Sequence, residues 1–89
     1  MLIFIVSAKH PCQKIKIVEA EVINPEKWTW AVYKGRRHLV GTTAFYTFAS
    51  AKRAKVSYLT KIANTSALSF IQPELYKKAQ MLLKLGVFE

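Results

Sequence analysis

The middle of the chain carries a strong β-hairpin signal, which constrains the fold more than any other feature. Residues 28–34 alternate, so that Trp28, Trp30 and Val32 point to one side of an extended strand. The turn that follows contains Gly35, which adopts positive φ angles without steric cost. We therefore predict two antiparallel strands, with the return strand over residues 38–47 and a candidate break at Gly41.

Apolar runs predict further strands on either side of this hairpin. Residues 2–6 are apolar and mostly β-branched or aromatic, which is typical of a buried strand. Residues 14–23 are a second candidate, but their apolar side chains change face midway. Such a change indicates a bulge, or a strand that is covered on both sides. Residues 66–72 alternate again and predict a strand between the two helices.

Capping residues predict two helices and complete the fold class. Ser50 is a candidate N-cap for a helix over residues 51–63. Pro73 suits the first turn of a last helix, and Gly86 is its expected end. The predicted order is β-β-β-β-α-β-α, an α+β fold with a single mostly antiparallel sheet and both helices on one face. We expect one domain over residues 1–89.

The composition indicates a basic protein that folds without disulfides. Fourteen Lys and Arg oppose five acids, all of them Glu, and the formal net charge is +9. A charge of this size on a small domain favours polyanionic partners. The single cysteine, Cys12, cannot form a disulfide within the chain, which suits a reducing compartment. We expect a cytoplasmic protein of a bacterial cell or phage-infected host, with no membrane partner and with homodimers possible because the core is small.

The positive charge is concentrated in residues 27–63, which contain eight Lys and Arg, no acid and seven of the eleven aromatic residues. Cations bind phosphates, and aromatic rings stack on unpaired bases. The first candidates for binding nucleic acid or another partner are the hairpin residues Lys34, Arg36, Arg37 and His38, with Tyr33 as a stacking residue. The second group, at the start of the first helix, consists of Lys52, Arg53 and Lys55.

Two less specific interpretations accompany these candidates. Trp28 and Trp30 share a strand face, so at least one of them is expected in the core. An Arg-Arg pair at a hairpin tip is often no more than a solvated turn. A further alternative is an inhibitor or adaptor that docks on an acidic face of a host protein complex through the basic hairpin.

The segments at residues 28–37 and 45–54 resemble the strand-hairpin-strand-helix module at the N-terminus of tyrosine recombinases. In that family a Trp-rich strand, a turn with Gly and basic residues, and a Phe-Thr-Lys-x-x-Ala helix start build a small sheet that contacts DNA. The resemblance covers residues 27–63 and implies DNA binding. This chain departs by adding strands before the module and a strand and helix after it. In size and charge it is also similar to small phage accessory proteins, including anti-CRISPR proteins.

Residues for catalysis or metal binding are sparse, so we expect no enzyme, no cofactor and no metal site. His10, Cys12 and His38 are the only soft metal ligands, which is too small a set for a zinc site without a second chain. Glu19 and Glu21 are two apart and could form a carboxylate pair on one strand, although an exposed strand explains them equally well. The glycines are scattered, so no phosphate-binding loop is predicted.

Overall fold

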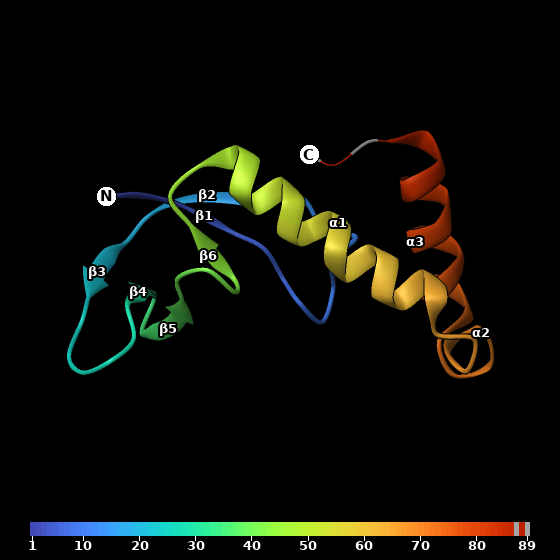
Figure 1. Cartoon of the computed structure of the whole chain (residues 1–89), viewed down its shortest axis with the longest axis horizontal. Helices are drawn as coiled ribbons and strands as arrows, with labels where there is room; N and C mark the ends of the chain where they lie inside the picture. Colours follow the sequence, from blue (N-terminus) through green and yellow to red (C-terminus); the bar gives the residue numbers. More distant parts are fainter. Residues whose placement is uncertain (87, 89) are drawn as a thin grey trace.

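The computed structural model describes residues 1–86 and 88 and has an α+β fold. The molecule is elongated, with extents of 40 × 23 × 20 Å. Its radius of gyration is 14.0 Å, whereas a compact domain of this length has a radius of gyration of roughly 12 Å. Figure 1 shows the strands towards one end of the long axis and α2 and α3 at the other. The elements are β1 (Leu2–Ile5), β2 (Lys16–Glu19), β3 (Glu21–Ile23), β4 (Trp30–Tyr33), β5 (Arg36–Leu39), β6 (Ala44–Phe45), α1 (Phe48–Asn64), α2 (Leu68–Ile71) and α3 (Pro73–Leu85).

The strands form two antiparallel sheets, so the prediction of a single sheet is wrong. The first sheet has the order β2-β1-β6 and the second β3-β4-β5. The predicted strand over residues 14–23 breaks at Ala20, whose buried N–H donates to the Met1 carbonyl at 3.0 Å. Before the break Glu19 pairs with Leu2 in the first sheet, and after it Glu21 pairs with Val32 in the second. The change of face in the sequence has another cause, because Ile15 packs in a cluster with Ala51 of α1 and Val18 in a cluster with Ala31 of β4. The alternative of a strand covered on both sides is therefore the correct one.

The predicted return strand is divided in the same way. β5 ends at Leu39, and the chain turns through Gly41, whose φ of +98° is a conformation that glycine tolerates best. The next strand, β6, returns to the first sheet, where Ala44 pairs with Ile5. The chain thus leaves the first sheet at Ala20, forms β3, β4 and β5 of the second sheet, and rejoins the first sheet at Ala44.

The first sheet is covered on both faces. On one face Ile3, Ile5 and Val18 pack in a buried cluster with Ala31 of the second sheet. On the other face Val6 and Phe45 pack in a second cluster with Ala51 of α1. The molecule is therefore layered as second sheet, first sheet and α1, and α3 packs against α1. Of the two predicted helices only α1 covers a sheet face, because α3 packs against α1 and α2, so the expectation of both helices on one face is met in part.

The first helix begins three residues before the predicted start. Its N-cap is Thr47, whose Oγ1 accepts a hydrogen bond from the Ser50 N–H at 3.2 Å, so the prediction of Ser50 as cap is wrong. The last helix agrees with the sequence: Pro73 lies in its first turn, and Gly86 ends it with a left-handed φ of +72°. No helix in the described part of the chain has the length and apolar character needed to cross a membrane.

The predicted strand over residues 66–72 is wrong, because this segment forms the short helix α2. Its alternation suggested that Leu68 and Phe70 share a buried face. Leu68 is half-buried, but the Phe70 side chain is 88 % exposed. Backbone bonds such as Ile71 N–H to the Ala67 carbonyl, at 3.2 Å, close a helical turn. A short apolar run has the same pattern for a strand and for one helical turn.

Candidate polyanion-binding groove

The central hairpin has the tight turn that its sequence predicts. Lys34 and Gly35 have φ angles of +49° and +75°, and Tyr33 pairs with Arg36 across the turn. Positive φ at both central residues is the requirement of the type I′ turn, which matches the twist of the two strands. The turn therefore consists of residues 34 and 35, and the two arginines begin the return strand.

Strand pairing decides which hairpin side chains lie together. Ala31 pairs with His38 and is fully buried in the core between the sheets. Arg36 is two residues from His38 and therefore points to the same inner face. Arg37 pairs with Val32 and points to the opposite, outer face of the second sheet. The structure thus separates the two arginines that the sequence placed in one candidate site.

A hollow of about 560 Å³ opens beside this inner face, and basic side chains from three segments line it. Among the residues that the structure describes, no carboxylate lines this hollow. Its positively charged or titratable lining residues are Lys9, His10, Lys14, Lys16, Arg36 and His38. A second hollow of about 350 Å³ shares four lining residues with the first and extends to Tyr33 and Lys34 at the hairpin tip. We call the two together the basic groove.

The register of the first sheet explains why Lys16 enters the basic groove. Lys16 pairs with Ile5, and Val18 pairs with Ile3, so that all four side chains point towards the second sheet. The inner three are buried or nearly so, whereas Lys16 lies at the open end of the row and is exposed. Lys16 therefore lies opposite the hairpin residues Arg36 and His38.

The nearby acids are directed away from the basic groove. The carboxylate of Glu19 accepts a hydrogen bond from the N-terminal ammonium of Met1. Glu21 follows the break at Ala20 and pairs with Val32, so it lies on the outer face of the second sheet. The two carboxylates are thus in different sheets, and the carboxylate pair considered from the sequence is wrong.

The concentration of positive charge changes the titration of His38. Partial burial lowers the pKa of His38 below its ordinary value, and the positive charges of Arg36 and Lys16 lower it further. His38 is consequently neutral at pH 7, when its ring nitrogens can donate one hydrogen bond and accept another. An anion in the basic groove would oppose these effects and favour the protonated ring.

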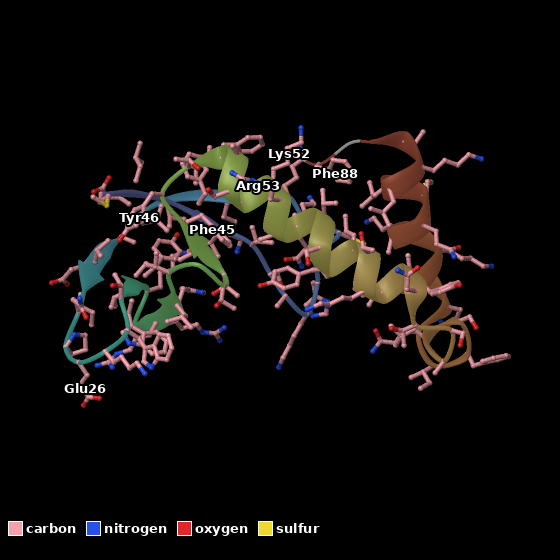
Figure 2. The ribbon with its side chains drawn as sticks, in the orientation of Figure 1. Glu26, Phe45, Tyr46, Lys52, Arg53 and Phe88 are labelled. Atoms are coloured by element: carbon pink, nitrogen blue, oxygen red, sulfur yellow. The ribbon has the colours of Figure 1, made fainter. Side chains whose placement is uncertain are left out.

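The basic residues of the first helix do not join the groove. Lys52 and Arg53 are exposed on the first turns of α1, which covers the other face of the first sheet (Figure 2). Lys55 is only 2 % exposed, and its Nζ donates to the Gln13 carbonyl at 2.8 Å. The predicted role of Lys55 in partner binding does not fit this burial, because an extended partner has no access to its ammonium group.

The aromatic candidates differ in exposure. Tyr33 is half-buried against the core between the sheets, and the Lys34 ammonium lies 5.4 Å from its ring centre. Trp28 is 55 % exposed, with the Lys27 ammonium 5.3 Å from its ring centre, whereas Trp30 is half-buried. Neither tryptophan belongs to a buried cluster, so the expectation that at least one of them lies in the core is wrong.

Sequence reasoning missed the half of the groove that comes from the first quarter of the chain. Lys9, Lys14 and Lys16 were hidden because residues 1–26 contain equal numbers of Lys and Glu. Strand parity carried the signal, since Lys14 and Lys16 have the parity of the buried Val18. Residues that follow the same strand face beyond its buried residues lie at the edge of the core, where the two sheets open to solvent.

The arrangement provides cations and hydrogen-bond donors for an anionic ligand. Within residues 1–86 and 88, no three His, Cys or acidic residues are grouped so as to hold a metal ion. Comparisons with protein-family models, with curated proteins and with solved structures gave no match to this chain.

Proposed function

We propose that this protein binds nucleic acid and that the basic groove holds the sugar-phosphate backbone. The observation that supports the proposal is that Lys9, Lys14, Lys16 and Arg36 line one hollow from separate segments, with no carboxylate beside them in the described part of the chain. Phosphates repeat along a nucleic acid, and each cation that neutralises one releases condensed counterions. A row of cations inside a groove therefore suits a chain of phosphates better than a single small anion.

The lining favours contacts with the backbone over contacts with bases. Its one aromatic residue, Tyr33, is half-buried and already lies beside the Lys34 ammonium. Base stacking needs exposed rings, and base-specific recognition needs side chains that reach base edges. We therefore expect binding with little sequence preference, and no chemical step.

A second candidate function is docking on an acidic protein surface, as an inhibitor or adaptor would do. The hairpin region supports it, because Arg37 extends from β5 on the outer face of the second sheet and Trp28, in the loop before β4, is 55 % exposed. Tryptophan and arginine are enriched among the residues that dominate protein interfaces. The two candidate functions use opposite faces of the same hairpin, so mutations can separate them.

The proposal is tested by fluorescence anisotropy with labelled single- and double-stranded DNA and RNA. The informative variant is Lys16→Ala/Arg36→Ala, which removes two groove cations. Its matched control is Lys52→Ala/Arg53→Ala, which removes the same two residue types from the exposed start of α1. Both variants have the same net charge, so a selective loss in the first is due to position.

Three outcomes are distinguishable. Selective loss of nucleic-acid binding in the groove variant supports the proposal. Equal loss in both variants means that net charge alone drives binding, and the groove assignment then fails. If polyglutamate competes as well as nucleic acid, and Trp28→Ala/Arg37→Ala abolishes capture of an acidic protein, the second function is favoured.

A further inference from the structure

The loop between β1 and β2 carries half of the Lys and Arg side chains that line the larger hollow of the basic groove. It spans residues 6–15 and contributes Lys9 and Lys14. The other two, Lys16 and Arg36, belong to strands, and strand pairing fixes their positions. Residues 6–15 form neither strand nor helix, so sheet pairing does not hold the two loop lysines. Other contacts must place them beside the strand cations.

A buried side chain of α1 attaches this loop to the helix. The Lys55 Nζ donates to the Gln13 carbonyl at 2.8 Å, and the Lys55 side chain is only 2 % exposed. Figure 1 shows the loop after β1 passing beside α1. The accepting carbonyl belongs to the planar peptide unit that joins Gln13 to Lys14. The hydrogen bond therefore fixes the backbone from which the Lys14 side chain starts.

Local hydrogen bonds extend this attachment towards Lys9. The Gln13 N–H donates to the His10 carbonyl at 3.0 Å, and the His10 N–H donates to the Ser7 Oγ, also at 3.0 Å. Pro11 lies between them and is fully buried, and its ring fixes the φ angle at that position. A peptide held at Gln13 thus limits the positions that are open to the rest of the loop.

The burial of the Lys55 ammonium makes the attachment strong. A charge that leaves water is costly unless it finds hydrogen-bond partners, so the ammonium favours a loop that stays in place. A hydrogen bond from an ionised donor is also roughly twice as strong as one between neutral groups. Gln13 itself is exposed, so its carbonyl can turn to water when the ammonium is removed.

We propose that Lys55 is a positioning residue of the basic groove, which holds residues 6–15 so that the loop lysines face the same hollow as the strand cations. Lys55 makes no phosphate contact, because its side chain is buried. This role differs from the direct binding that the sequence suggested for Lys55. It rests on the proposed function of the groove, whereas the attachment of the loop does not.

Anisotropy titrations of labelled duplex DNA over a range of salt concentrations test the role. Lys55→Met removes the ammonium and keeps an unbranched side chain that adapts to irregular core gaps. The matched control is Lys52→Met, which removes the same charge from an exposed position in the preceding turn of α1. Four phosphate contacts predict a slope of log K against log salt of about −3.6, and two predict about −1.8. We expect the slope of Lys55→Met to approach the second value and that of Lys52→Met to keep the first.

A double-mutant cycle separates positioning from a general loss of structure. In a chain that already carries Lys9→Ala/Lys14→Ala, the further change Lys55→Met is expected to leave the slope unchanged, since the side chains that it positions are gone. A further fall of the slope in that background overturns the proposal. So does a folded Lys55→Met variant, verified by circular dichroism, that keeps the wild-type slope.

Amide hydrogen exchange tests the attachment without any ligand. In the wild type the Gln13 amide is expected to exchange more slowly than in an unstructured peptide, although Gln13 is exposed. Lys55→Met should speed exchange at Gln13 and His10, and Lys52→Met should not. Exchange of the wild-type Gln13 amide at the rate of a free peptide means that the loop is not held, which overturns the proposal even if Lys55→Met does not fold.

Failure of this proposal is distinguishable from failure of the proposed function. If the slope falls in Lys16→Ala/Arg36→Ala but not in Lys55→Met, the groove binds nucleic acid and the positioning role is wrong. If the wild type binds no nucleic acid, the proposed function fails and the role of Lys55 in binding fails with it. The exchange rates then decide only whether Lys55 holds the loop.

Discussion

Replacing Lys16 and Arg36 by alanine should lower the salt dependence of nucleic-acid binding by a calculable amount. Four Lys and Arg side chains line the larger hollow of the basic groove, namely Lys9, Lys14, Lys16 and Arg36. His38 adds no charge at pH 7, because burial and its cationic neighbours lower its pKa. For duplex DNA the slope of log K against log salt is about −0.9 per neutralised phosphate, or about −3.6 for four contacts.

These slopes predict distinct losses of affinity on raising the salt concentration. Between about 50 and 200 mM, a slope of −3.6 weakens binding about 150-fold. The Lys16→Ala/Arg36→Ala variant retains two contacts, a slope of about −1.8 and a loss of about 12-fold. With single-stranded DNA the wild-type slope falls to about −2.8, because the charge density is lower.

The assay is anisotropy titration of a labelled 20-nucleotide probe at four salt concentrations, with wild type, groove variant and the Lys52→Ala/Arg53→Ala control. The control is expected to keep the wild-type slope, since both of its residues lie on α1, outside the basic groove. A groove variant whose slope matches the wild type refutes the reasoning. So does a control whose slope falls as far as that of the groove variant.

Three further predictions concern the folded state. The pKa of His38 is lowered by folding from its ordinary value of 6.5, so protons favour the unfolded chain. Its contribution to stability is therefore complete above 6.5 and is lost as the pH falls from there through the lowered pKa of the folded protein. Urea titrations give the free energy of unfolding at pH 7.5 and at pH 5.5. The difference between these two free energies should be smaller for His38→Gln than for wild type. Thr47→Ala should cost about 1 kcal/mol of unfolding free energy and Ser50→Ala clearly less, because the Thr47 hydroxyl caps α1. Gly35→Ala should lower thermal stability by about 1 kcal/mol, and Gly35→Asn by less, because φ is +75° there; equal effects would argue against the type I′ turn.

The hairpin was predictable because its determinants are local. Gly35, the alternation of β4 and the basic residues around the turn all lie within ten residues of one another. Positive φ at two adjacent positions depends on the residue types at the turn itself. The start of α1 was missed by three residues because Thr47 and Ser50 are both residue types that cap helices well. The Phe48 ring lies 6.1 Å from that of Phe4 in β1, centre to centre.

The division into two sheets was not predictable from local pattern. The break at Ala20 is stabilised by a hydrogen bond to the carbonyl of Met1, nineteen residues away. The return of the chain to the first sheet at Ala44 likewise depends on pairing with Ile5 of β1, which is distant in the sequence. The apolar alternation continues through the break, since Val18, Ala20 and Val22 pack in one cluster, so it gives no sign that the chain changes sheet there.

The candidate site was half predictable for the same reason. Arg36 and His38 were found because positive charge is concentrated in residues 27–63. Lys9, Lys14 and Lys16 come close to them only through the packing of the two sheets. Burial also reverses expectations made from charge. Lys55 lies on a face of α1 that packs on the loop before β2, and the Gln13 carbonyl accepts its ammonium hydrogen bond.

If sheet packing assembles the basic groove, then overfilling the junction should weaken binding without any change in charge. Ala31 has no exposed surface and pairs with His38, so Ala31→Val forces the hairpin away from the first sheet. Ala79 also has no exposed surface, but it lies on α3. The same substitution there should cost a similar 1–3 kcal/mol, roughly, of unfolding free energy.

Ala31→Val is therefore expected to bind nucleic acid more weakly than Ala79→Val at one fixed salt concentration, with both variants shown by circular dichroism to be folded. The reason is that moving β4 and β5 separates Arg36 and His38 from Lys16, whereas strain at Ala79 leaves all three in place. Equal affinities for the two variants would mean that the cations act independently of their arrangement. The basic groove would then be a charged surface and not a binding site built by the fold.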